Sequence, residues 1–230
     1  LIMHGGVIDF GESDATLCLD MRHYDGAPGS VFTFKVRHVE TRGLRSFPWS
    51  ARSTATAKRL KTKLPDHAKP RSIDLAKPPA DVSLANAAAL GAKRVGGSLV
   101  YPDQCDALGR LRGEHFPGRI SDSAVNLVAP WRQAAASEGV QPAGAVVEAR
   151  FVFRKFPRAG ELIEVHSGIV EVADKTLRLV HWILDPESGA AWASMEAVVL
   201  TFDVNTRKAL TPTPAATERV AKLLVSGLGV

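Results

Sequence analysis

The stretch that decides the fold of this chain occurs twice. Residues 4–23 read HGGVIDFGESDATLCLDMRH, and residues 166–185 read HSGIVEVADKTLRLVHWILD. Glycine and apolar positions recur with an offset of 166 − 4 = 162 residues, so that Gly6 matches Gly168 and Leu17 matches Leu179. This offset is too long for a solenoid repeat and fits a duplicated domain.

The two copies differ in what precedes them. The second copy follows a long segment with a charged motif and a helix, whereas only three residues precede His4. The sequence therefore predicts one and a half copies of a two-copy protein. The counterpart of residues 99–166 is expected to lie outside this sequence, because residues 1–3 are neither an initiator start nor a signal peptide.

Composition bounds the class of protein. The 230 residues are 45% hydrophobic and 23% charged, which is enough for one large or two small cores. The net charge of +5 is spread along the chain and indicates a solvated surface or an anionic substrate rather than a nucleic acid. Two cysteines indicate no disulfide framework and a cytoplasmic, reducing location. No apolar run is long enough to span a membrane, and no histidine has metal-ligand spacing.

Hydrophobic periodicity predicts three regions. Residues 1–64 are the C-terminal part of a first repeat, with antiparallel strands and a short helix that Ser50 caps. Residues 65–97 are a proline-rich linker with a short helix that begins at Ser83 and ends at Gly91. Residues 98–230 are a second, complete repeat.

The second repeat combines one central helix with four long strands. The helix is expected from Ser121 to about Ala136, with Ser121 or Asp122 as its cap and a kink at Pro130. The other expected elements are a short strand at 99–101, a polar loop at 103–113, strands at 145–154, 162–172, 176–184 and 191–203, and a closing helix at 214–224. A lone helix beside a sheet must be wrapped by it to bury its apolar side. The predicted class is α+β, with the hotdog arrangement.

The loop before the central helix carries a resemblance to a known family. Residues 101–111 read YPDQCDALGRL, and with the helix and strands that follow they resemble the acyl-CoA thioesterase branch of the hotdog superfamily, the 4-hydroxybenzoyl-CoA thioesterase-like proteins. The turn at 157–161 and the later strands fit as well. The resemblance covers residues 98–205 and, through the repeat, residues 4–47. It is nearest to bacterial double-hotdog proteins, in which one chain carries both halves of a dimer.

The resemblance implies roles for the loop residues. Asp106 would activate water or attack the thioester directly, and the amides of Gly109, Arg110 and Leu111 would polarise its carbonyl oxygen. Gly109 would let the substrate approach the backbone closely. Coenzyme A would enter as part of the substrate, and no separate cofactor is implied. Judged by its spacing alone, Asp106 is a loop carboxylate that hydrogen-bonds its own turn.

Further residues are candidates for substrate binding. Arg110 and Arg112 could bind a carboxylate or a CoA phosphate, and Phe116 stands near a position where the family often has Tyr. Arg154, Lys155 and Arg158 form a basic edge that could meet the CoA phosphates. Solvent-exposed charges are the alternative for all five basic residues.

Two other functions compete with thioester hydrolysis. A non-catalytic protein that binds acyl-CoA or an acyl carrier would keep the fold without the chemistry. Residues 115–118 read HFPG, which resembles the histidine motif of hydroxyacyl thioester dehydratases, but residues 126–131 hold no acid to act with it. In each case the expected protein is a homo-oligomer formed through hotdog sheets.

Overall fold

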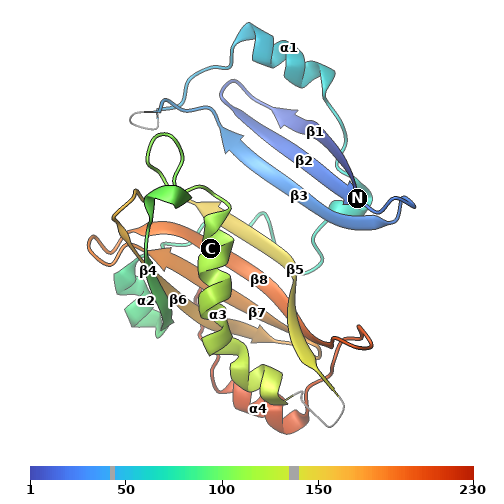
Figure 1. Ribbon diagram of the computed structural model, residues 1–230, viewed down its shortest axis with the longest axis vertical. Helices are drawn as coiled ribbons and strands as arrows, with labels where there is room; N and C mark the ends of the chain where they lie inside the picture. Colours follow the sequence, from blue (N-terminus) through green and yellow to red (C-terminus); the bar gives the residue numbers. More distant parts are fainter. Residues whose placement is uncertain (42–44, 135–139) are drawn as a thin grey trace. The chain divides into compact units, whose positions relative to one another are not determined.

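The computed structural model describes residues 1–41, 45–134 and 140–230, and side chains outside 130–139. The chain forms two compact units, Leu1–Arg71 (unit 1) and Ser72–Val230 (unit 2). Each unit contains an antiparallel sheet and helices (Figure 1), in agreement with the predicted α+β class. The boundaries near residues 64 and 97 that the sequence indicates stay predictions.

Unit 1 is a three-stranded antiparallel sheet with a helix. Its strands are β1 (Ile2–Phe10), β2 (Asp14–Arg22) and β3 (Pro28–Arg37), in that order. Helix α1 (Ala51–Arg59) follows, and a short 3₁₀ helix η1 (Asp66–Ala68) lies beyond it. The Ser50 hydroxyl accepts a hydrogen bond from the Ser53 amide at 3.1 Å, which confirms the predicted cap.

Unit 2 is a five-stranded antiparallel sheet in the order β4-β6-β7-β8-β5. Its strands are β4 (Lys93–Leu99), β5 (Pro142–Phe153), β6 (Leu162–Val172), β7 (Thr176–Leu184) and β8 (Ala191–Asp203). The predicted bounds of the last three strands are confirmed. Its helices are α2 (Leu84–Leu90), η2 (Pro102–Gln104), α3 (His115–Ala134) and α4 (Pro214–Ala221).

The central helix α3 begins six residues before the predicted start. Phe116 is fully buried and Ile120 is 4% exposed, so the apolar side of the helix begins before Ser121. Pro117 lies in the first turn, where its missing amide proton costs no helical hydrogen bond. The predicted cap at Ser121 or Asp122 is therefore wrong. Helix α3 continues through Pro130 to Ala134, and the predicted end near Ala136 lies outside the described residues.

Strand β4 lies earlier than the strand predicted at 99–101. Its sequence, KRVGGSL, has no clear alternation, and Val95 is its single buried side chain. Gly96 faces Ser123 of α3, and a Cβ at Gly96 would collide with the serine hydroxyl. Gly96 makes β4 hard to recognise from the sequence as a strand. The same glycine allows α3 to pack closely against β4.

The sheet of unit 2 is covered on both faces. One face packs on α3 through a core that includes Phe116, Ile163, Leu177, Leu179 and Ile183, and Figure 1 shows α3 running along this face. A second core on the opposite face joins β7 to the segment around α2 and to the C-terminal residues. Its members include Val82, Ala87, Val180, Trp182, Leu184, Leu228 and Val230.

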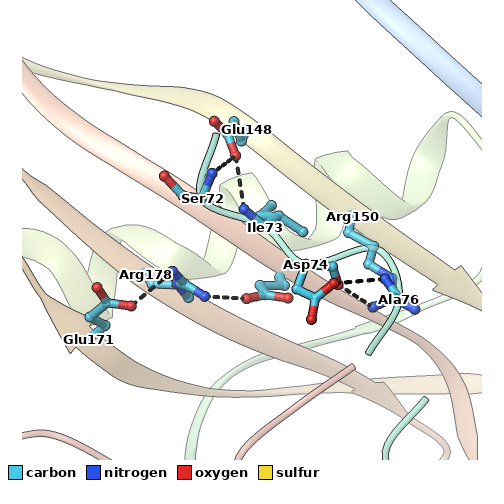
Figure 2. Close-up of polar contacts among 9 residues, drawn as sticks. Ser72, Ile73, Asp74, Ala76, Glu148, Arg150, Glu171 and Arg178 are labelled. Atoms are coloured by element: carbon cyan, nitrogen blue, oxygen red, sulfur yellow. Dashed lines mark hydrogen bonds and ion pairs between the residues drawn. The ribbon is translucent and has the colours of Figure 1, made fainter. Parts of the chain in front are cut away.

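The segment Ser72–Ala80 leads into the second core. It is held by polar side chains of β5 and by Arg154, just after β5. The Glu148 carboxylate accepts the Ser72 and Ile73 amides at 3.0 and 3.1 Å (Figure 2). Arg150 donates to the carbonyls of Asp74 and Lys77 at 3.1 and 2.9 Å. The predicted surface linker is therefore fixed to the sheet along part of its length.

Candidate functional site

The loop before α3 is a tight hairpin. Cys105 and Leu111 form an isolated antiparallel bridge, and the Asp106 amide donates to the Arg110 carbonyl at 2.7 Å. Gly109 has φ of 74°, in the left-handed region that favours glycine. Local turn chemistry thus sets the shape of this loop and aims Asp106 back toward its own backbone.

The Asp106 carboxylate makes four hydrogen bonds, all within the loop. One oxygen accepts the amides of Leu108 and Arg110 at 2.8 and 3.0 Å. The other accepts Nε and a terminal nitrogen of the Arg110 guanidinium at 3.1 and 3.0 Å. The Arg110 amide, assisted by the Leu108 amide and the guanidinium, lowers the pKa of this carboxyl. Asp106 is therefore ionised at neutral pH, and both of its oxygens already have donors.

The three amides expected to polarise a substrate carbonyl also have partners. Gly109 donates to the Asp106 carbonyl at 2.9 Å, Arg110 to the Asp106 side chain, and Leu111 to the Pro157 carbonyl at 2.7 Å. The amides of Gly113 and Glu114, just before α3, have no acceptor among the described residues. The sequence pattern does not single out these two amides, because their lack of a partner depends on where α3 begins.

The turn after β5 packs against this loop. Arg110 and Arg158 form an antiparallel bridge, and the Ala159 amide donates to the Gly109 carbonyl at 3.3 Å. The Arg158 side chain reaches the Leu108 carbonyl at 3.5 Å. Two arginines that are 48 residues apart in the sequence (158 − 110 = 48) are thus brought to the same loop, where the Arg110 guanidinium contacts the Asp106 carboxylate and the Arg158 guanidinium contacts a backbone carbonyl. We call Asp106, Arg110 and Arg158 the loop cluster.

Two other predicted substrate-binding residues are accessible from solvent. Arg112 is exposed and contacts the carboxylate of Glu114 at 3.1 Å and Nε2 of His115 at 3.0 Å. Lys155 is exposed, and its amide donates to the Trp192 carbonyl at 3.1 Å. Both side chains can meet an anionic ligand without any change in the core.

Phe116 and Arg154 are not placed as a substrate-binding role requires. Phe116 is fully buried and packs edge-on against Phe153 and Phe156, with ring centroids 5.2 and 5.7 Å apart. Arg154 donates to the Ser194 hydroxyl at 2.8 Å and to the Ala80 carbonyl at 3.2 Å. Burial lowers the pKa of Arg154. The structure corrects both assignments: Phe116 belongs to the core, and Arg154 fixes the end of the segment Ser72–Ala80.

The HFPG motif forms the first turn of α3. The Arg112 guanidinium lies 3.0 Å from Nε2 of His115. Asn126, further along the helix, donates to the Val95 carbonyl at 3.1 Å. Across the part of the chain that the structure describes, no three His, Cys, Asp or Glu side chains are grouped to hold a metal ion.

The architecture of unit 2, a five-stranded antiparallel sheet with a long helix along one face, defines a class that the comparisons with known proteins identify. The family model of the Thioesterase-like superfamily matches residues 100–220. This match covers more than half of the chain and includes the loop cluster, so the chain belongs to the Thioesterase-like superfamily, whose fold is the hotdog.

One solved structure supports this fold, and two others show a weaker likeness. A Pseudomonas putida KT2440 protein, provisionally assigned as a thioesterase, superposes with a TM-score of 0.50 at 20% identity, over 60% of this chain and 90% of that one. A 1,4-dihydroxy-2-naphthoyl-CoA thioesterase from Synechocystis has a TM-score of 0.46 at 18% identity, over 56% and 95% of the two chains. The Staphylococcus aureus protein SAV2348, solved in complex with CoA, has a TM-score of 0.49 at 13% identity, over 60% and 90%.

No curated protein matches the chain. Among the described residues, no helix has both the length and the apolar character that crossing a membrane requires.

Proposed function

We propose that this protein hydrolyses thioesters of acyl-CoA or of an acyl carrier, with Asp106 as the base or nucleophile. The supporting observation is that the superfamily match spans a loop whose ionised carboxylate contacts the Arg110 guanidinium, while Arg158 of the turn after β5 reaches a backbone carbonyl of the same loop. If the loop had only a structural role, Asp106 would be enough to hold its turn. Arg158, from the turn after β5, would not be needed.

In the proposed reaction, Asp106 takes a proton from a water molecule as that water attacks the thioester carbon. The carbonyl oxygen becomes an oxyanion, which the amides of Gly113 and Glu114 could stabilise as donors at the start of α3. Collapse of this intermediate breaks the carbon–sulfur bond and releases the CoA thiolate, which regains a proton. Before Asp106 can act as the base, one of its carboxylate oxygens must leave its contact with the Arg110 guanidinium.

The basic residues around the loop suit the anionic half of the substrate. Arg158 and Lys155 are exposed, and Arg110 keeps one terminal nitrogen outside its contacts with Asp106. Guanidinium groups bind phosphate with fixed geometry, while the ammonium acts as a point charge. The phosphates of CoA, or a phosphopantetheine group, are the proposed ligands of these three side chains.

A non-catalytic protein that binds acyl-CoA or an acyl carrier is the second candidate. One observation favours it: both Asp106 oxygens and the amides of Gly109, Arg110 and Leu111 are already hydrogen-bonded within the fold. Such a loop can present arginines to phosphate without any rearrangement.

Asp106→Asn separates the two functions, because asparagine keeps the acceptor for the loop amides and removes the charge. Release of free thiol from a panel of acyl-CoAs should fall by about 100-fold or more if Asp106 is the base, while CoA binding by calorimetry persists. The matched control is Asp103→Asn in the same loop, which should keep full turnover. Unchanged turnover in Asp106→Asn would remove Asp106 from the mechanism, and no turnover by the unmodified protein would favour the binding function.

We also propose that units 1 and 2 are tandem copies of one hotdog framework, and that the protein is an oligomer located in the cytoplasm. The tandem proposal is supported by the 162-residue sequence match. Free Cys18 and Cys105 suit a reducing compartment. Val146 and Val147, exposed by 56% and 51% on edge strand β5, suit association of sheets. Light scattering would test the oligomer.

A further inference from the structure

Unit 1 contains an apolar groove between α1 and its sheet. Its volume is about 370 Å³. The side chains that line it are mostly apolar and come from all three strands and the helix region: Val7, Phe10, Ala15, Leu17, Val36, Trp49, Ala57 and Leu60, with Arg52 at the side of α1. Nothing in the catalytic proposal uses this groove.

The framework around the groove recurs in unit 2 contact by contact. Strand β1 has a bulge between Val7 and Asp9, and β6 has one between Ile169 and Glu171, an offset of 162 residues (169 − 7). After the helix, the Thr62 amide donates to the Val7 carbonyl, and the Val225 amide donates to the Ile169 carbonyl. The helices also begin alike, because the hydroxyl of Ser50 caps α1 and that of Thr213 caps α4. From β3 onward the offset is 163 (213 − 50), so positions in the two units can be matched one to one.

In unit 2 the surface that matches the groove is covered by a helix. Ile169, Leu177 and Leu179, the counterparts of groove-lining Val7, Ala15 and Leu17, belong to the first core with α3. Four neighbours in the same core are at most 6% exposed: Ile163, Val165, Met195 and Ala197. The counterparts of these four neighbours in unit 1 are Leu1, Met3, Phe32 and Phe34, which are 58%, 65%, 45% and 46% exposed. They lie beside the groove, and Phe34 is paired across the sheet with Leu17, which lines it. Each position is apolar in both units, although solvent reaches only those of unit 1. Large apolar side chains gathered on one exposed face mark an interaction surface.

We propose that this groove binds an amphipathic helix in the place that α3 occupies in unit 2. The occupant presents branched and aromatic side chains at the spacing of Phe116, Ile120 and Leu127, which fall on one side of a helix. Helix α3 itself is used in the core of unit 2, so the occupant is a partner helix from outside these 230 residues.

Charge adds a second requirement for the partner. Helix α1, ARSTATAKR, has three basic residues and no acidic one, and Arg52 lines the groove. A partner helix with an acidic flank beside α1 is therefore favoured over one with a basic flank.

The test uses the full 230-residue chain and a synthetic helix. The probe is a fluorescein-labelled peptide with the sequence of residues 113–134, in which Arg119→Glu and Arg132→Glu replace both arginines with acidic residues. Its partner peptide carries Ser in place of Phe116, Ile120 and Leu127. Anisotropy titrations compare the unmodified protein with Phe34→Asp and with Thr33→Asp. Phe34 and Thr33 are adjacent on β3 and both are exposed, but their side chains lie on opposite faces of the sheet.

We expect saturable binding of the probe with a dissociation constant on the order of 10 μM, weakened at least about tenfold by Phe34→Asp and unchanged by Thr33→Asp. The serine peptide should not bind. The proposal is overturned if the probe does not bind, if both protein variants weaken it equally, or if the serine peptide binds as well. It is also overturned if the protein alone self-associates and Phe34→Asp abolishes that association, because the occupant is then a second copy of the chain.

Discussion

Acid should destabilise unit 2 through one buried histidine. His181 of β7 is 1% exposed and lies on the α3 side of the sheet, where Nδ1 is 2.7 Å from the Ser167 hydroxyl. Burial lowers the pKa of its imidazole from 6.5 to about 4. In the unfolded chain His181 therefore binds a proton near pH 6.5, whereas in the folded chain it binds one only near pH 4.

The sign and size of the effect follow from this difference in pKa. Lowering the pH through this window favours the unfolded state, so stability falls as the pH falls. Between pH 7.5 and pH 5.0 the loss from His181 is about 2 kcal/mol, and it approaches about 3 kcal/mol below pH 4. The measurement is urea unfolding at a series of pH values, followed by tryptophan fluorescence. A Trp49→Phe background leaves only tryptophans of unit 2 as reporters.

The comparison variant is His181→Leu combined with Ser167→Ala, so that no buried hydroxyl loses its partner. Its unfolding free energy should change between pH 7.5 and 5.0 by about 2 kcal/mol less than that of the unmodified protein. His23→Gln removes an exposed histidine and should leave the pH dependence as it was. Equal pH dependence in the double variant and the unmodified protein would refute the reasoning, as would an NMR titration of His181 with a midpoint above pH 6.

Three further predictions concern the second face of the sheet in unit 2. Gly168→Ala should cost about 1–3 kcal/mol in urea unfolding, since the new Cβ would lie 3.0 Å from Cβ of Val225; no loss would mean that the C-terminal segment shifts freely. Trp182→Phe removes the hydrogen bond to the Gly229 carbonyl at 2.7 Å and should cost about 1–3 kcal/mol, measured in the same way. Arg154→Met should speed limited proteolysis within residues 72–82 without changing CoA binding, and unaltered cleavage would show that Arg154 does not hold this segment.

The loop cluster shows how far the sequence could predict a site. Asp106 and Gly109 lie three residues apart, and a turn over that distance is set by local chemistry that the sequence contains. Arg158 joins them only because the turn after β5 packs on the loop, and that contact depends on the whole sheet. The sequence could place Arg158 in a basic turn that could meet the substrate. It could not predict that Arg158 pairs with Arg110.

Phe116 and Arg154 show where prediction from the sequence fails. Their residue types suit a binding site equally well in solvent and in a protein interior, so the sequence pattern does not tell the two apart. The start of α3 decides that Phe116 enters the core, and the path of Ser72–Ala80 decides that Arg154 binds a carbonyl. Each depends on contacts between segments far apart in the chain.

The sequence by itself determined the α+β class, the bounds of β6, β7 and β8, the cap at Ser50, the stop of α2 at Gly91, and the superfamily. These features rest on periodicity and turn chemistry, which act over a few residues. Only the tertiary structure decided where β4 and α3 begin, which amides of the loop are free, and which apolar residues of unit 1 face solvent. Those depend on close packing between distant segments, where a missing side chain such as that of Gly96 matters as much as one that is present.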